Sequence, residues 1–122
     1  MSGGLLVIGR SGQLARALYR AGPEDLACAG RGAFDLAGGD AGALLDAHAP
    51  RAVINAAAFT DVDGAEDARE PAYELNAQGP ARLAAACARR GVRFLHVSTD
   101  YVFSGQDGGA PYAEDAPTHP LN

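Results

Sequence analysis

Three consecutive polar residues, Ser98, Thr99 and Asp100, carry the strongest chemical signal in the sequence. The residues before them, 92–97, are mostly apolar and predict a buried strand that ends where the polar residues begin. Hydroxyl and carboxylate groups at the mouth of such a strand can hydrogen-bond a carbonyl group or the oxygens of a sugar. Residues at strand ends are seldom placed there for packing alone, so we predict that these side chains bind a substrate.

A glycine turn near the amino terminus offers a second kind of chemistry. Residues 5–8 are apolar and β-forming, Gly9 and Gly12 follow them, and helix-forming residues begin at Gln13. This order predicts a strand, a tight loop and a helix start whose free N–H groups can bind a pyrophosphate. Gly12 would leave no side chain between the backbone and the phosphate. The same spacing is common in ordinary strand-to-helix turns, so the motif alone leaves both interpretations open.

The elements that would position these residues alternate along the chain. We expect strands at 5–8, 26–29, 33–36, 52–55 and 92–97, and helices at 13–20, 40–48 and, in several pieces, 62–90. Strands that are apolar on both faces predict a parallel sheet covered by helices on both sides. The fold class is therefore α/β, a doubly wound Rossmann sheet truncated after about five strands.

The same pattern predicts the division of the chain into domains. Residues 1–103 would form an NAD(P)-binding Rossmann domain. Residues 104–122 are rich in Gly, Pro and acidic residues and have no periodicity, which is typical of a mobile loop. We expect this loop to lead toward a missing catalytic and substrate-binding part.

Composition limits the class of protein. The chain has 122 residues, 48% hydrophobic, with a net charge of −5, which allows one domain with a real core and argues against nucleic-acid binding. No apolar run is long enough to span a membrane and no signal-peptide pattern is present. Cys28 and Cys87 lie in apolar surroundings as reduced core residues. We therefore expect a cytoplasmic protein without membrane or nucleic-acid partners.

Metal ligation is not expected from this sequence. The histidines and cysteines are not at metal-ligand spacing. Asp61 begins a segment similar to a calcium loop, but the remaining ligand positions are wrong, so we interpret it as a helix start.

Three further groups at predicted strand ends could bind a dinucleotide. Arg31 follows the second strand, where an arginine can clamp the 2′-phosphate of NADP, but a solvated surface arginine fits equally well. Asp35 could accept a hydrogen bond from an adenine while Leu36 covers the base, or Asp35 could only cap a loop. Residues 56–58 are all alanine, which would admit a flat or sugar-like group or serve close packing.

Four segments together resemble the dTDP-4-dehydrorhamnose reductase family, extended short-chain dehydrogenases that act on sugar nucleotides. They are Gly9-Arg10-Ser11-Gly12-Gln13-Leu14, Asn55-Ala56-Ala57-Ala58-Phe59-Thr60-Asp61-Val62-Asp63, Glu74-Leu75-Asn76 and Ser98-Thr99-Asp100-Tyr101-Val102-Phe103-Ser104-Gly105. The resemblance covers the whole chain. It implies hydride transfer from NADPH, or NADH, to the C4 ketone of dTDP-4-dehydro-6-deoxy-L-mannose (dTDP-6-deoxy-L-lyxo-4-hexulose), giving dTDP-L-rhamnose. It also implies a homodimer for the complete protein.

The resemblance implies a role for each matching residue. Gly9 would belong to the cofactor-binding loop, in which Gly12, Gln13 and Leu14 hold the pyrophosphate. Arg31 would bind the adenosine ribose, Asp35 and Leu36 the adenine, and Ala56, Ala57, Ala58 and Val97 the nicotinamide half. Thr99 would hydrogen-bond the keto group, and Asp100 would lie beside it on the substrate. Ala15 stands where many such loops have a third glycine.

A larger departure concerns the family's proton donor, a Tyr followed four positions later by a Lys. The lysine lowers the pKa of the tyrosine and holds the nicotinamide ribose. All 10 basic residues of this sequence are Arg, so none of its four tyrosines has such a partner. In the family the pair follows shortly after a Pro-Leu-Asn like residues 120–122. We therefore expect an amino-terminal part of such a reductase that is inactive by itself.

Two other functions stay open on these residues. Relatives of the family serve as non-catalytic regulatory subunits, such as the β subunit of methionine adenosyltransferase, and a chain with the glycine loop but without Tyr and Lys would suit that role. A sugar-nucleotide epimerase or dehydratase is the third alternative, although Gly12-Gln13 and residues 56–60 favour the reductase.

Overall fold

The structure is a computed structural model that describes residues 3–106 and 108–122. In this part of the chain, parallel strands form one sheet in the order β2-β1-β3-β4. The strands are β1 (Gly3–Ile8), β2 (Ala27–Ala29), β3 (Pro50–Asn55) and β4 (Arg93–His96). Because β1 lies between β2 and β3, the strand order reverses beside it, as in a doubly wound sheet.

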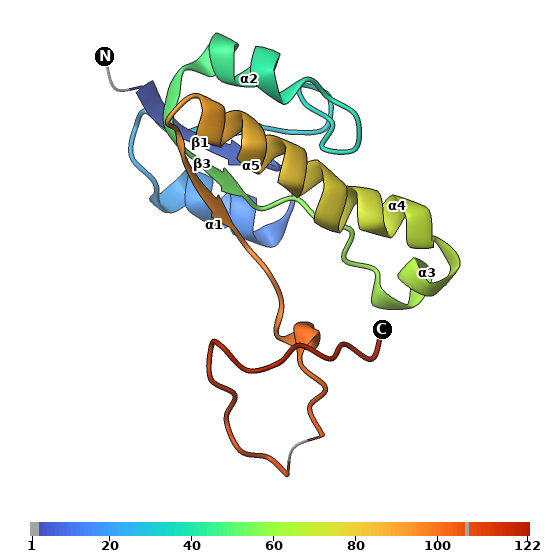
Figure 1. The fold of residues 1–122 in the computed structure, drawn as a ribbon. Coiled ribbons are helices and arrows are strands. Elements are labelled where there is room, and N and C mark those ends of the chain that lie inside the picture. Colours follow the sequence, from blue (N-terminus) through green and yellow to red (C-terminus); the bar gives the residue numbers. More distant parts are fainter. Residues whose placement is uncertain (1–2, 107) are drawn as a thin grey trace.

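Helices cover both faces of the sheet (Figure 1). One face carries α1 (Gln13–Ala21), and the other carries α2 (Ala41–His48) and α5 (Gly79–Arg89). This arrangement confirms the predicted α/β Rossmann sheet with helices on both faces.

The predicted helical region between β3 and β4 forms several pieces, as expected. It begins with α3 (Val62–Asp67) and α4 (Arg69–Tyr73), and a π-helical turn, η1 (Glu74–Gln78), then runs directly into α5. Such wide turns occur mostly as single insertions in α-helices, often at functional sites. A short 3-10 helix, η2 (Asp100–Val102), follows β4.

The strand predicted at residues 33–36 is absent, so the expectation of about five strands is wrong by one. These residues form a turn in which the N–H groups of Ala33 and Phe34 both donate to the Gly30 carbonyl. Phe34 and Leu36 are nevertheless buried and belong to the core on the side of α2 and α5. Their alternation with exposed neighbours resembles a strand, but packing against helices buries them without a ladder.

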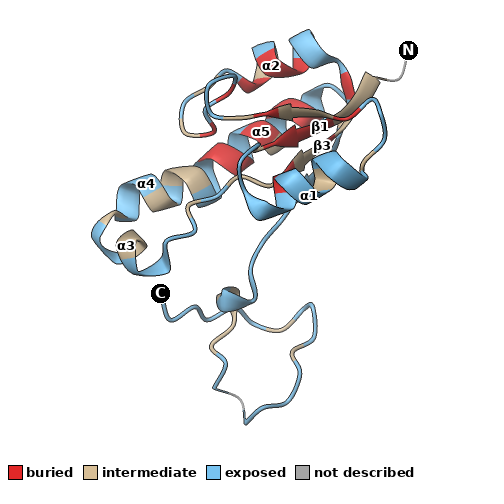
Figure 2. Cartoon of the chain, turned by 180° about the vertical axis from the view of Figure 1, so that it is seen from behind, coloured by how far each residue is buried: buried red, intermediate tan, exposed pale blue. Residues whose placement is uncertain are grey.

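Alternate strand residues point to opposite faces and build two cores. On one face Leu6 and Val53 pack with Leu83 of α5, which is 0% exposed. On the other face Val7 packs with Ala15 of α1. Figure 2 shows the buried residues gathered in the strands, α2 and α5, whereas α1 is largely exposed.

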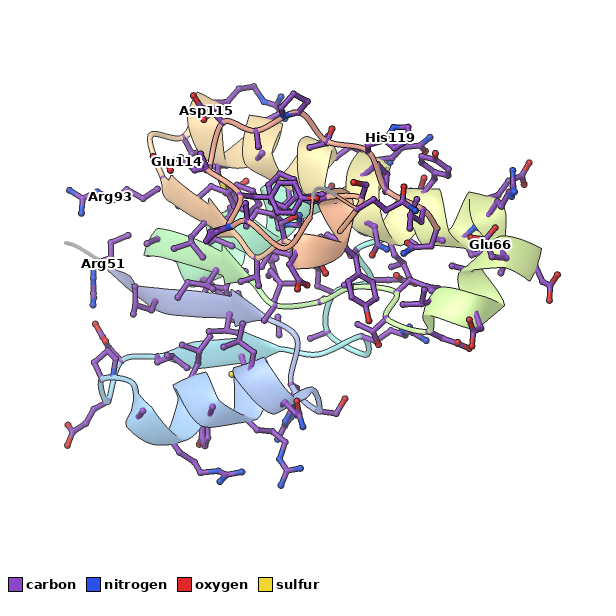
Figure 3. All side chains as sticks on the ribbon, turned by 90° about the horizontal axis from the view of Figure 1, so that it is seen from below. Arg51, Glu66, Arg93, Glu114, Asp115 and His119 are labelled. Atoms are coloured by element: carbon purple, nitrogen blue, oxygen red, sulfur yellow. The ribbon has the colours of Figure 1, made fainter. Side chains whose placement is uncertain are left out.

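The two ends of the sheet differ in what they can bind. At the amino ends, Arg51 donates to Asp25 at 2.6 Å and to the Gly3 carbonyl at 3.2 Å. Arg93 lies beside Arg51 on the neighbouring strand, and Glu66 lies on α3 at the opposite end of the molecule (Figure 3). The amino ends are therefore occupied by structural contacts, and the carboxyl ends open into small-residue loops, where doubly wound sheets bind ligands.

The segment after η2, residues 104–106 and 108–122, contains no helix or strand and extends away from the sheet (Figure 1). Tyr112 stacks on Phe103 with ring centroids 4.6 Å apart, and its hydroxyl accepts a hydrogen bond from the Gly105 N–H at 2.9 Å. The His119 N–H donates to the Val102 carbonyl at 2.8 Å. The domain boundary at 103 and the mobility of this segment stay predictions.

Candidate functional site

The glycine loop lies at the point where the strand order reverses. Gly9 has a φ of +115°, a conformation that side chains rarely adopt, so glycine is required there. Its N–H donates to the Ala29 carbonyl at 2.8 Å, and the Ala56 N–H donates to the Ile8 carbonyl at 2.9 Å. The loops that follow β1, β2 and β3 are thereby held side by side.

Gly12 occupies the N-cap position of α1, and unlike Gly9 it does not need a conformation that favours glycine. Its φ of −70° and ψ of 161° are open to any residue, and a Cβ built there would meet nothing within 4 Å. It also gives up the side-chain cap that Ser or Asp would provide. Gln13 and Leu14 follow in the first turn, whose N–H groups have no partner within the helix. Neither the backbone nor the packing therefore requires glycine at position 12.

A cleft of about 870 Å³ opens beside the loop and is lined by Arg10, Arg16 and Arg31, together with Ser11, Cys28 and Gly30 among others. Within the described residues, none of these three arginines forms an ion pair. Three cations without acidic partners, in a chain of net charge −5, favour an anionic ligand. The predictions included Arg31 but missed Arg10 and Arg16. Their positions, inside the glycine motif and one helical turn after Gly12, were the available signal.

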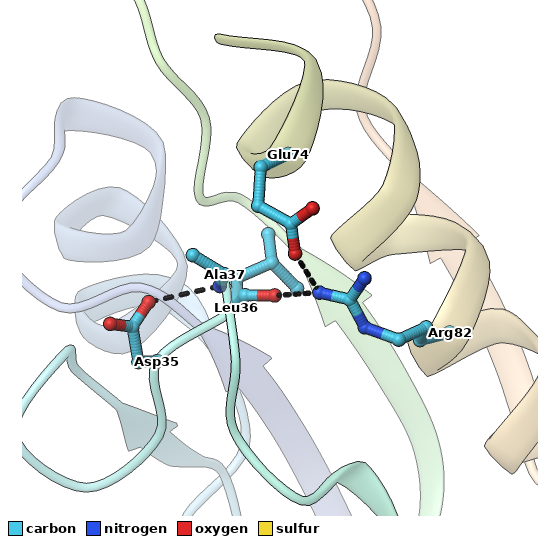
Figure 4. Close-up of polar contacts among 5 residues, drawn as sticks. All are labelled: Asp35, Leu36, Ala37, Glu74 and Arg82. Atoms are coloured by element: carbon cyan, nitrogen blue, oxygen red, sulfur yellow. Dashed lines mark hydrogen bonds and ion pairs between the residues drawn. The ribbon is translucent and has the colours of Figure 1, made fainter. Parts of the chain in front are cut away.

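A smaller hollow of about 60 Å³ brings together several of the predicted cofactor residues. These are Gly9, Arg31, Asp35, Leu36, Ala57 and Ala58, with Phe34 and Leu75 among the other residues of its wall. Asp35 is exposed, and its Oδ1 accepts a hydrogen bond from the Ala37 N–H at 2.9 Å (Figure 4). The carboxylate therefore caps its own turn and also lines the hollow, so both interpretations of Asp35 agree with its position.

Two asparagines hold the alanine segment in place. Asn55 is 1% exposed, its Oδ1 accepts from the Ala57 N–H at 3.2 Å, and its Nδ2 lies 3.1 Å from Nδ1 of His96. Because an amide nitrogen only donates, this contact needs an unprotonated Nδ1 on His96. Asn76 of η1 accepts from the Phe59 N–H at 2.8 Å and donates to its carbonyl at 3.0 Å. The supporting roles of Asn55 and Asn76 were not predicted, although a polar residue ending an apolar strand was a signal for the first.

The predicted substrate residues lie apart from the hollow that collects the cofactor residues. Oγ1 of Thr99 accepts from the Tyr101 N–H at 3.2 Å and donates to Oδ1 of Asp100 at 3.4 Å. Asp100 lines a separate hollow of about 380 Å³ with Tyr101 and Tyr112 among others. Val97 continues the ladder one residue past β4 by donating to the Asn55 carbonyl at 3.3 Å. In the part of the chain described, the structure does not join Thr99 and Asp100 to the cofactor residues in one cavity.

Both cysteines lie where their thiols are kept protonated. Burial raises the pKa of the Cys28 thiol against the opposing charge of Arg10, and it raises the pKa of the Cys87 thiol against that of Arg90. A thiol with a raised pKa is a poor nucleophile and metal ligand. Residues 3–106 and 108–122 contain no group of three or more His, Cys, Asp or Glu side chains arranged for a metal ion. The same residues form no helix long and apolar enough to cross a membrane.

The family described as RmlD substrate binding domain matches residues 3–122. The chain belongs to this family. A dTDP-4-dehydrorhamnose reductase of Streptomyces griseus is 45% identical over 120 residues, which cover 94% of this chain and 39% of that protein. A protein of the same name from Mycobacterium tuberculosis (strain ATCC 25618 / H37Rv) is 59% identical over 71 residues, 56% of this chain and 23% of that protein. The predicted resemblance is confirmed.

Solved structures agree with the fold. A dTDP-4-dehydrorhamnose reductase from Bacillus anthracis, in complex with NADP, matches with a TM-score of 0.90 at 30% identity, covering 100% of this chain and 44% of that one. The corresponding protein of Clostridium acetobutylicum matches with a TM-score of 0.88 at 32% identity, covering 96% and 43%. The chain thus spans less than half the length of these relatives.

Proposed function

We propose that this chain is the cofactor-binding part of a reductase that uses NADPH to reduce a dTDP-bound 4-keto sugar. The sugar nucleotide we propose is dTDP-4-dehydro-6-deoxy-L-mannose, whose reduction gives dTDP-L-rhamnose. The names of the Streptomyces and Mycobacterium relatives support the substrate, and the NADP complex of the Bacillus anthracis relative supports the cofactor.

The observation that carries the proposal is Gly12. Any residue could adopt the backbone conformation of Gly12 without strain, yet the position at this helix N-terminus is a glycine. A ligand that approaches the backbone closely would explain the absence of a side chain. No acidic side chain lies in the first turn of α1 to repel an anion. The three unpaired arginines of the adjacent cleft fit the remaining phosphate of NADPH.

Different residues of the chain then bind different parts of the cofactor. The first turn of α1, with Gly12, Gln13 and Leu14, holds the pyrophosphate, and Arg31 holds the 2′-phosphate. The adenine lies in the small hollow against Asp35 and Leu36. The nicotinamide end lies against Gly9, residues 56–58 and Val97, where small side chains let it approach the backbone closely.

Thr99 donates a hydrogen bond to the substrate ketone, and Asp100 lies beside it on the sugar. The hydrogen bond that Thr99 donates to Asp100 is long, at 3.4 Å, and therefore weak. Breaking it to bind the ketone costs little free energy. Bound NADPH supplies the hydride. The Tyr and Lys that would supply the proton lie outside these 122 residues in this proposal, because the sequence contains no Lys.

The decisive experiment compares a valine placed at Gly12 with a valine placed away from the cleft and the hollows. Gly12→Val should weaken NADPH binding by more than about tenfold, roughly 1.4 kcal/mol, because the new side chain occupies the space of the pyrophosphate. Ala47→Val is the control, since Ala47 is exposed on α2 and lines none of the hollows above. Calorimetric titration measures both. Equal affinity of the two variants for NADPH would overturn the proposal.

Turnover tests the reaction itself. The intact protein, as its source makes it, should oxidise NADPH when given the dTDP-keto sugar and release dTDP-L-rhamnose. Residues 1–122 alone should show no turnover. NADPH binding without turnover by the intact protein would favour the regulatory alternative, and turnover by the 122 residues alone would contradict the assignment of the proton donor.

A further inference from the structure

The turn that carries Leu36 is tied to the rest of the protein by one arginine. Nη2 of Arg82 on α5 donates to the Leu36 carbonyl at 3.2 Å across 46 positions of sequence (Figure 4). The backbone hydrogen bonds of residues 33–39 are otherwise local, to the carbonyls of Gly30 and Asp35. Among the described residues, the Arg82 contact is thus the only hydrogen bond that joins this turn to a distant element.

A second contact fixes the arginine itself. Arg82 forms an ion pair with Glu74, the first residue of η1, through the same Nη2 atom (Figure 4). The next residue, Leu75, lines the same small hollow as Leu36. One guanidinium group therefore links two segments that each supply a residue to the wall of this hollow.

The backbone at the start of α5 is shaped to allow this link. Gly79 is buried, and a Cβ there would lie 2.9 Å from both the Glu74 carbonyl oxygen and Cγ of Leu36, with the Leu36 carbonyl oxygen closer still. The turn thus lies directly on the first turn of α5. Leu36 is 4% exposed, so a shift of its backbone would also move the side chain that forms the hollow.

We infer that Arg82 is a positioning residue for the adenine end of the cofactor, acting through the Leu36 carbonyl and held in place by Glu74. Arg82 itself is not among the residues that line the hollow. By linking the two segments it fixes the positions of Leu36 and Leu75, and with them the shape of the hollow that forms the slot for a flat base. This inference rests on the proposed function, because it assigns adenine to that hollow.

The test measures ADP and NADPH affinity in the intact protein by calorimetry. Arg82→Gln should weaken both ligands by about tenfold, because a charge-assisted hydrogen bond at the slot is lost. Arg89→Gln is the matched control on the same helix: it makes the same change in charge at an exposed residue and should leave both affinities unchanged. Arg82→Lys keeps a cationic donor and should restore affinity to within about threefold of the wild type.

The outcomes separate this inference from the proposed function. If Arg82→Gln and Arg89→Gln bind ADP equally well, the positioning role is wrong although the protein still binds the cofactor. If the wild-type protein binds neither ADP nor NADPH, the proposed function itself fails. Should Arg82→Gln not fold, Glu74→Gln tests the same link: about threefold weaker ADP binding supports it, and wild-type affinity overturns it.

Discussion

Replacing Gly79 by alanine separates helix propensity from tertiary packing. Gly79 begins α5, and alanine is favoured over glycine in helices by about 1 kcal/mol, so the helix considered alone should become more stable. The folded protein should respond in the opposite direction. A Cβ at this position would press on the carbonyl oxygens of Leu36 and Glu74, both backbone atoms that cannot rotate away.

The expected magnitude follows from these two opposing effects. Overpacking a well-filled site costs about 1–3 kcal/mol. Because the atoms in the way are backbone oxygens, the upper part of that range applies, about 2–3 kcal/mol. After subtracting about 1 kcal/mol of helix preference, Gly79→Ala should lower the free energy of unfolding by about 1–2 kcal/mol. The contact also pushes against the Leu36 turn, so a loss of ADP affinity should accompany the loss of stability.

Urea unfolding of the variant gives the measurement, as a lower midpoint at an unchanged slope. Gly42→Ala in α2 is the control. Its Cβ would approach Nη2 of Arg90 at 3.0 Å and Oδ1 of Asp40 at 3.2 Å. These are side-chain atoms that can shift by a few tenths of an ångström, although each forms a hydrogen bond, to Asp46 and to the Ala43 N–H. This variant should therefore stay within about 1 kcal/mol of the wild type. A Gly79→Ala protein as stable as the wild type would refute the packing argument.

Two further predictions concern charge. Arg31→Asp in the intact protein should weaken the affinity for NADPH at least about tenfold more than the affinity for NADH. The change removes a cation that binds the 2′-phosphate and adds an anion that repels it. Equal losses of affinity in titrations with the two cofactors would count against a role of Arg31 in binding this phosphate. Arg90 donates hydrogen bonds to Asp46 at 2.8 and 3.2 Å, and these hold the pKa of the Asp46 carboxyl below its usual value. The ionised carboxylate therefore stabilises the fold at pH values above its unfolded-state pKa. This stabilisation is lost as the pH falls through the folded-state pKa. Asp46→Asn should therefore have a lower melting temperature than the wild type at neutral pH and a shrinking difference in acid; a difference independent of pH would contradict this assignment.

Local patterns in the sequence were sufficient for most of the architecture. The apolar run at 5–8 followed by Gly9 and Gly12 predicted the first strand, the loop and the start of α1. Helix pieces between residues 62 and 90 were expected, and Gly79-Pro80 does lie at the start of one of them. These features depend on residues that are neighbours in the chain, whose conformations limit one another directly.

The exceptions all involve partners distant in sequence. Phe34 and Leu36 alternate with exposed residues as a strand would, but they are buried by packing against the helices of one face, and no neighbouring strand pairs with them. The distinction between a ladder and a packed turn lies in what the segment meets in space.

The sequence by itself determined the fold class and the position of the glycine loop, because strand and helix periods and glycine positions depend on contiguous residues. The family was identified separately, by the resemblance of four sequence segments. Only the tertiary structure decided that Arg10 and Arg16 share a cleft with Arg31, and that Arg82 holds the carbonyl of Leu36. Those residues meet because a parallel sheet brings the ends of distant segments to one edge. A pattern among neighbouring residues cannot show which distant segments will lie side by side.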